Sequence, residues 1–166
     1  MMETSKPIKR SQAIVPLSRD HHNGLLLCWK IRTGLKNNIS IDRIAAYIIH
    51  VFDTELYEHF YQEEKYLFPL IPSDNPKNIQ AHKEHISICN QINILRNKVT
   101  DKAALSIIAD ELEAHIRFEE RDLFNYIEQH ADTLKLETAG KLLQELHEIS
   151  CIDNWDDEFW IKPQTK

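Results

Sequence analysis

Apolar residues recur every three or four positions along most of the chain, and this spacing is typical of amphipathic α-helices. Few runs alternate between apolar and polar residues as a β-strand would. The pattern predicts four long helices at about 17–35, 42–68, 76–98 and 102–130, and a shorter fifth helix at about 134–148. We therefore expect an all-α fold.

Short connections separate the four long helices. Because short connections join antiparallel neighbours, we expect an up-down-up-down four-helix bundle. Residues that favour helix N-caps stand before the later helices, and two prolines end the second helix. Asn37 and Asn38 break the chain after the first helix. The expected caps are Ser40 or Asp42 for the second helix, Asn75 for the third and Asp101 for the fourth. Pro69 and Pro72 end the second helix.

The chain divides into three parts. Residues 1–14 are expected to form a flexible N-terminal arm, and residues 15–150 the bundle, with Gly140 as a weak point of the fifth helix. Residues 151–166 contain two Trp and a Phe. Since exposed Trp is costly, we expect this aromatic C-terminal tail to pack on the bundle.

One motif, H-x-x-x-E-E-x-x-L-F, occurs at 59–68 and again at 115–124. At about 100° per residue, His59 and Glu63 lie in the middle of the apolar stripe of the second long helix. His115 and Glu119 lie in the same position on the fourth. The second and fourth helices of such a bundle are diagonal and parallel, so the two copies should meet at one depth in the core.

Two glutamates in one core require compensation. A buried unpaired carboxylate is costly and two of them repel, yet neither stripe contains an inward Lys or Arg. A multivalent cation between Glu63 and Glu119 would compensate both charges. The second glutamate of each pair, Glu64 or Glu120, is expected to point away as a solvated charge.

The other two long helices offer further histidines. His85 lies on the apolar stripe of the third helix with His82 at its edge, and His21 lies on the stripe of the first helix with His22 on its flank. A lone inward histidine is more often a hydrogen-bonded core residue than a ligand. The repeated His–Glu pair favours a metal site with four or five histidines and two glutamates. The remaining histidines, His50, His130 and His147, are assigned to solvent or packing.

Mixed imidazole and carboxylate ligands suit iron, manganese or zinc and disfavour magnesium and calcium. So many ligands exceed the needs of one tetrahedral zinc. They fit two ions about 3.5–4 Å apart, bridged by the two carboxylates. Two six-coordinate iron ions would keep at least one open position, where a diatomic molecule or peroxide can bind.

Composition narrows the class of protein. The chain has 166 residues and a net charge of −6, which argues against a nucleic-acid binder. No apolar run approaches the roughly 20 residues that span a bilayer. The first residues, MMETSKPIKRSQ, lack the apolar stretch of a signal peptide. Cys28, Cys89 and Cys151 are too scattered for a disulfide framework, so we expect reduced thiols and a cytoplasmic protein.

Four segments together resemble the hemerythrin-like (HHE cation-binding) family, in order from about residue 17 to 130. They read L-S-R-D-H-H at 17–22, H-F-Y-Q-E-E-K-Y-L-F-P at 59–69, A-H-K-E-H at 81–85 and H-I-R-F-E-E-R-D-L-F at 115–124. Ferritin-like di-iron bundles use E-x-x-H instead. The resemblance implies a non-haem di-iron centre with these ligands: His21, His59, Glu63, His85, His115 and Glu119.

The chain departs from the oxygen-carrying members of that family in two places. Those members have H-x-x-x-H on the third helix, where this chain has His82-x-x-His85. They also have an Asp after H-x-x-x-x on the fourth helix, where this chain has Glu119 after H-x-x-x. The broader HHE branch shares both departures and has varied functions. The choice between His21 and His22, and between His82 and His85, stays open.

Three functions follow from these observations. The first is a binding protein that binds or senses oxygen, nitric oxide or peroxide, or holds iron. The second is a di-iron redox enzyme that consumes peroxide or nitric oxide, or donates iron for cluster repair, with Tyr66, Tyr126 and Asp122 as sources of protons or electrons. The third is an interaction bundle that docks through its aromatic tail and keeps its His and Glu residues as vestiges.

Overall fold

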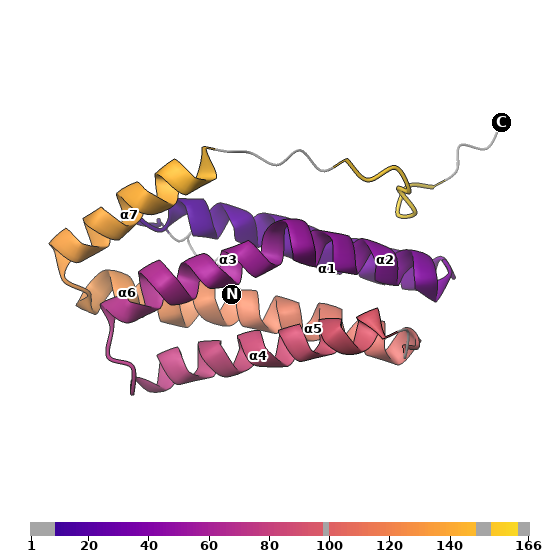
Figure 1. Cartoon of the computed structure of the whole chain (residues 1–166), viewed down its shortest axis with the longest axis horizontal. Coiled ribbons are helices and arrows are strands. Elements are labelled where there is room, and N and C mark those ends of the chain that lie inside the picture. The colour runs from indigo at the N-terminus through magenta and orange to yellow at the C-terminus, as the bar shows by residue number, and fades with distance from the viewer. Residues whose placement is uncertain (1–8, 98–99, 149–153, 163–166) are drawn as a thin grey trace, which may run out of the picture.

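The computed structural model describes residues 9–97, 100–148 and 154–162, and within these ranges every regular element is helical (Figure 1). The prediction of an all-α fold is confirmed. The α-helices are α1 (Val15–Lys36), α2 (Ile41–Val51), α3 (Tyr57–Gln62), α4 (Pro76–Arg96), α5 (Lys102–Phe118), α6 (Phe124–His130) and α7 (Thr133–His147).

Several of these helices join end to end. The π-helical turn η1 (Phe52–Leu56) connects α2 to α3, and the π-helical turn η2 (Glu63–Leu67) and the 3₁₀ turn η3 (Phe68–Leu70) extend α3. A third π-helical turn, η4 (Glu119–Leu123), connects α5 to α6. The helices predicted at 42–68 and 102–130 are thus each one rod with wider turns inside it.

Local sequence determines where the rods begin. The side chains of Ser40, Asn75 and Asp101 accept hydrogen bonds from backbone N–H groups in the first turns of α2, α4 and α5. These are predicted caps, and each satisfies one of the N–H groups that a helix start leaves unpaired. Asn38 has a φ of 55°, a left-handed conformation that asparagine tolerates and that separates α1 from α2.

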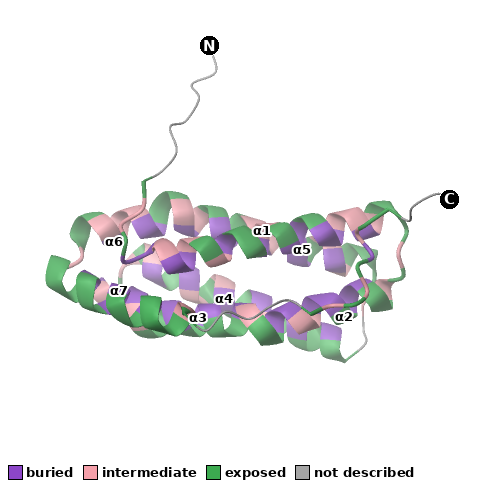
Figure 2. Ribbon diagram, turned by 90° about the horizontal axis from the view of Figure 1, so that it is seen from above, coloured by how far each residue is buried: buried purple, intermediate pink, exposed green. Residues whose placement is uncertain are grey.

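The rods lie side by side and form a bundle (Figure 1). Contacts join α1 to α5 and α2, and α4 to α5 and α2. The shorter α7 lies across one end of the bundle, against α1 and η2. Figure 2 shows buried residues along the faces that the rods turn toward one another.

The apolar core consists of two clusters, one toward each end of the bundle. One contains Leu27, Phe60, Ile88 and Ile116, and the other contains Leu17, Leu67, Ala81 and Leu123. Each rod contributes to both clusters. One polar residue on each rod, His21, Glu63, His85 or Glu119, lies between the two clusters, so a polar layer runs between them.

Residues 9–14 pack on the bundle, which differs from the expected flexible arm; residues 1–8 lie outside the described residues. Ile14 is fully buried. The Arg10 guanidinium donates to Glu120 Oε2 at 3.0 Å and to Asn125 Oδ1 at 2.8 Å. Gly140 of α7 lies so close to Ala13 that a Cβ would sit 2.5 Å from its Cα. Gly140 is therefore a packing contact rather than a weak point.

Residues 154–162 lie against α1 and α2. Phe159 is 4% exposed and its ring centre lies 5.8 Å from that of Tyr47. The Lys30 ammonium sits 3.8 Å from the centre of the Trp160 ring, a cation–π contact. The rest of the predicted tail, 151–153 and 163–166, is outside the described residues.

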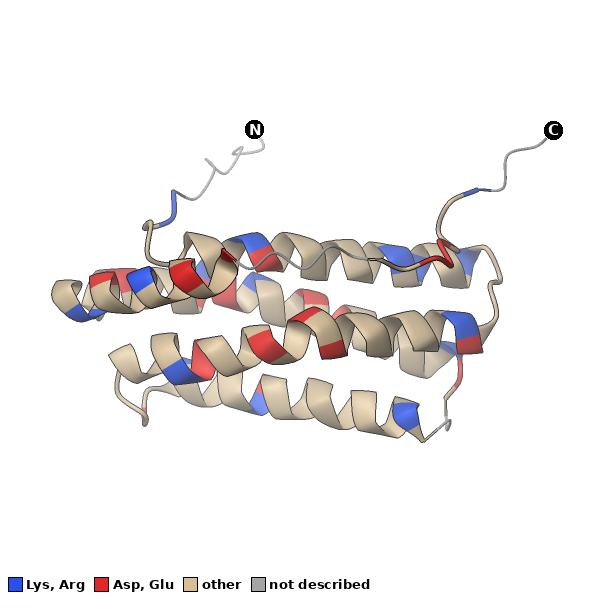
Figure 3. Cartoon of the chain, turned by 45° about the horizontal axis from the view of Figure 1, so that its top comes forward, with Lys and Arg blue, Asp and Glu red and all other residues tan. Residues whose placement is uncertain are grey.

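Figure 3 shows acidic and basic residues on several of the helices, and the net charge is −6. Within the described ranges, no helix is both long enough and apolar enough to cross a membrane.

Candidate metal centre

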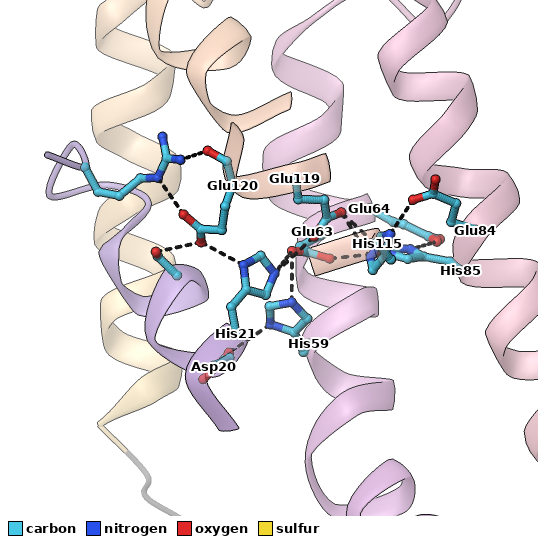
Figure 4. A network of polar contacts seen from close by, with 12 residues as sticks. Asp20, His21, His59, Glu63, Glu64, Glu84, His85, His115, Glu119 and Glu120 are labelled. Carbon is cyan, nitrogen blue, oxygen red and sulfur yellow. Dashed lines mark hydrogen bonds and ion pairs between the residues drawn. The ribbon is translucent and has the colours of Figure 1, made fainter. Parts of the chain in front are cut away.

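Six buried side chains converge in the polar layer between the two apolar clusters (Figure 4). They form two groups of four, and in each group one ligand atom per residue lies within 4.8 Å of the others. Glu63 and Glu119 belong to both groups. The first group adds His21 and His59, and the second adds His85 and His115.

The spacing of the donor atoms suits shared metal ions. His85 Nε2 lies 3.1 Å from His115 Nε2, and His21 Nε2 lies 3.0 Å from Glu119 Oε2. His59 Nε2 lies 2.9 Å from Glu63 Oε1. Two donors bound to one ion at about 2.1 Å, and roughly at right angles, lie about 3 Å apart. Each group therefore has the dimensions of one metal site.

Several donor atoms of the centre lack hydrogen bonds. His21 Nε2, His59 Nε2 and both carboxylate oxygens of Glu63 and of Glu119 are buried without a hydrogen-bond partner among the described residues. Buried polar atoms are normally paired, and an unexplained group of them indicates an ion or another missing partner. Nitrogen and oxygen donors suit iron, manganese or zinc, so the residues fit the cations expected from the sequence.

A carboxylate on the far side of each histidine fixes its tautomer. The Nδ1 atoms lie 2.7–3.0 Å from an Asp or Glu oxygen. Because a carboxylate accepts, Nδ1 carries the proton and the Nε2 lone pair faces the centre, as in carboxylate–histidine–metal sites. The four pairs are His21–Glu120 at 2.7 Å, His59–Asp20 at 3.0 Å, His85–Glu64 at 2.7 Å and His115–Glu84 at 2.7 Å.

These pairs correct one prediction. Glu64 and Glu120 were expected to be solvated charges, yet each accepts a hydrogen bond from a histidine on a neighbouring rod. Glu120 is also held by Ser18 Oγ at 2.7 Å. The angle of a residue on its own helix does not show what a long side chain reaches on the next helix. The repeated E-E doublet was the available signal, since its first member faces the centre and its second supports a histidine.

Two of the three π-helical turns begin at the shared carboxylates. η2 starts at Glu63 and η4 starts at Glu119. Single π-helical turns inside α-helices occur frequently at functional sites. The equal placement of η2 and η4 shows that the two motif copies adopt the same local backbone as well as the same sequence.

Burial and charge act against each other in the metal-free chain. Burial alone would lower the pKa of His59, but the charge of Glu63 and the hydrogen bond to Asp20 outweigh it and raise the pKa to about 9. Burial likewise opposes protonation of His21, yet its carboxylate partners, Glu119 foremost, hold the pKa well above 6.5. Burial would raise the pKa of Glu63, and the charge of His59 holds it well below 4.5. Protons on histidines thus balance the carboxylates when metal is absent.

Two of the predicted site residues lie outside both groups. His22 is exposed on α1 and belongs to neither group. The His82 side chain is 44% exposed, with Nδ1 3.6 Å from Glu64 Oε1 and its ring edge-on to Phe68. Of the two pairs left open in the sequence analysis, His21 and His85 are the members that belong to the groups. Three other residues, Asp20, Glu84 and His147, form hydrogen bonds around the centre and were not predicted from the sequence.

Three cavities touch histidines of the centre from different sides. A polar cleft of about 260 Å³ between α1, α3 and α7 is lined by His59 and Gln62. A cavity of about 310 Å³ reaches His85. A largely apolar groove of about 560 Å³ between α4 and α5 reaches His115. Each cavity is lined by a histidine together with the carboxylate on its Nδ1 side, so the cavities meet the outer sides of these histidines, while Glu63 and Glu119 are fully buried.

The family described as Hemerythrin HHE cation binding domain matches residues 13–127. The chain belongs to this family. The match contains both motif copies and all six residues of the two groups. No curated protein and no solved structure matches the chain.

Proposed function

We propose that the protein is a non-haem di-iron protein that binds or senses oxygen, nitric oxide or peroxide, or holds iron. The observation that supports this most is the pair of His₂Glu₂ groups that share Glu63 and Glu119. The proposed ligands are His21 and His59 for one ion, His85 and His115 for the other, and the two glutamates for both. Manganese or zinc would fit the same donors.

The ligand count supports an open site. Each group offers four protein donors, so a six-coordinate ion in it has positions left for water or another small ligand. Reduced iron with a free position supplies the capacity to bind a diatomic molecule or peroxide. The chain's own residues hold the histidines in one tautomer and exclude bulk water from the two glutamates.

The proposal includes finer points of structure and setting. We take the bundle as an up-down-up-down four-helix arrangement closed by the aromatic tail, with a small diatomic or peroxide ligand and neither nucleic acid nor membrane as partner. A cytoplasmic location is proposed because Cys28 and Cys89 are free thiols.

Metal analysis and rapid mixing test the function. The isolated protein should contain two iron ions per chain, and the reduced form mixed with oxygen or nitric oxide should give adducts that reverse when the gas is removed. Absence of bound metal after growth with ample iron would contradict the proposal. Irreversible oxidation with repeated turnover would contradict reversible binding and would support the alternative function below.

The alternative is a di-iron redox enzyme that consumes peroxide or nitric oxide, or donates iron for cluster repair. The position of His82 outside the centre favours this alternative. Without His82, each ion has two histidine ligands, so both ions keep open positions at which a substrate could bind. Multiple turnovers of peroxide or nitric oxide, or transfer of iron to an apo-cluster acceptor, would establish it.

A further inference from the structure

His147, at the C-terminal end of α7, contacts the support of the proposed metal centre. Its Nε2 lies 2.7 Å from Asp20 Oδ2, and the same oxygen lies 3.0 Å from His59 Nδ1. A chain of two hydrogen bonds thus leads from α7 to a proposed metal ligand. α7 begins at Thr133, beyond the residues that the family matches, so nothing in the family match assigns a role to His147.

The partners of His147 define its protonation. Its Nδ1 lies 2.7 Å from the Leu143 carbonyl oxygen, one turn earlier in α7. A carbonyl oxygen and a carboxylate oxygen both accept, so each ring nitrogen must donate a proton. The ring is then an imidazolium. The hydrogen bond to Asp20 raises the pKa of His147, in agreement with this assignment.

Asp20 is therefore shared between two donors. Its side chain is about one-third exposed, at the edge of the polar cleft that His59 and His147 also line. A carboxylate with one bond to His59 alone could rotate toward the water of the cleft. The second, charge-assisted bond from His147 holds the same oxygen in place and withdraws part of its negative charge.

We propose that His147 is a positioning residue of the metal centre, which as an imidazolium holds Asp20 so that His59 presents Nε2 to its ion. This proposal rests on the proposed function, because it requires a metal ion at His59. It predicts that α7 stabilises the ion at His21 and His59 and leaves the ion at His85 and His115 nearly unchanged.

The test compares three variants. His147→Leu removes the charge and the donor, whereas His147→Gln removes the charge and keeps an N–H that can reach Asp20. His130→Gln is the matched control, because His130 also bonds through Nδ1 to the carbonyl four residues earlier, at 2.9 Å, but contacts no carboxylate of the centre. Release of zinc and of iron to a chelator is followed for each, together with a ¹H–¹⁵N imidazole spectrum of the zinc-loaded protein.

Wild-type protein should show two protonated ring nitrogens for His147 and a protonated Nδ1 for His59. His147→Leu should release one of the two ions faster by roughly three- to tenfold, less than the roughly 10–100-fold typical when a residue that touches a ligand is removed. His147→Gln should lie between this variant and wild type, with a shifted His59 Nδ1–H resonance. His130→Gln should match wild type.

Contrary results separate the two proposals. The positioning role would be overturned by a neutral His147 in the wild-type spectrum. It would also be overturned if the His147 variants released both ions at the wild-type rate. In either case the two bound ions would still support the proposed function. If the wild-type chain holds no metal, the proposed function fails and the positioning role with it. If the His147→Leu variant does not fold, the wild-type spectrum and the His147→Gln variant still test the positioning role.

Discussion

Raising the pH of the metal-free protein from about 6.5 to 9 should lower its free energy of unfolding by at least about 3 kcal/mol, the contribution of His59. In the folded metal-free chain the pKa of His59 is about 9, against an ordinary value of 6.5. Each tenfold change in proton affinity is worth about 1.4 kcal/mol. Because the folded pKa is the higher one, the extra stability is fully present below pH 6.5 and is lost as the pH rises through 9.

Between pH 6.5 and 9, titration of the other groups of the centre either lowers the free energy of unfolding further or leaves it unchanged. The pKa values of His21 and His85 are also raised, so their protons add to the loss. The pKa of Glu63 is lowered, and its contribution is lost only as the pH falls through that low value. The metal-loaded protein should lack this loss, because metal ions replace the protons as the positive charge between the glutamates.

Denaturant unfolding at a series of pH values measures the effect. Metal-free protein should lose stability between pH 6.5 and 9, the metal-loaded protein should not, and metal-free His59→Gln should lose about 3 kcal/mol less than metal-free wild type over the same range. Metal-free stability that stays level or rises across this window would refute the reasoning that protons on histidines balance the buried carboxylates.

Further predictions concern the ligands, their supports and the tail. Glu119→Gln should reduce the metal content below two ions per chain by elemental analysis, since Glu119 belongs to both groups. Glu120→Gln should weaken the ion at His21 by roughly 10–100-fold in a chelator competition, with thermal unfolding of the metal-free form as the control. Phe159→Ala should cost about 3–5 kcal/mol of unfolding free energy while two ions remain bound, because Phe159 packs far from the centre. Metal binding at pH 7 should release protons, seen in calorimetry as heats that depend on the buffer.

The helices were predictable because each depends on local sequence. Apolar periodicity and the caps at Asn75 and Asp101 mark where rods begin, and both act within one or two turns. The inward direction of His59 and Glu63 follows from the same periodicity. What periodicity cannot show is a wider turn, so the π-helical turns inside the rods were missed.

The supports of the centre were not predictable in the same way. Asp20, Glu84 and His147 act across rods, and which rod they face depends on packing between helices distant in sequence. His147 was assigned to solvent or packing, and its contact with Asp20 spans 127 positions of the chain. Likewise, Arg10 was placed in a loose arm, although it pairs with Glu120 at 3.0 Å.

A crystal structure of protein grown with ample iron, with anomalous scattering collected at the iron edge, tests the central claim most directly. The account predicts two ions about 3.5–4 Å apart, with Glu63 and Glu119 both bound to the pair. A single ion, no ion, or either carboxylate turned away from the metal would contradict it.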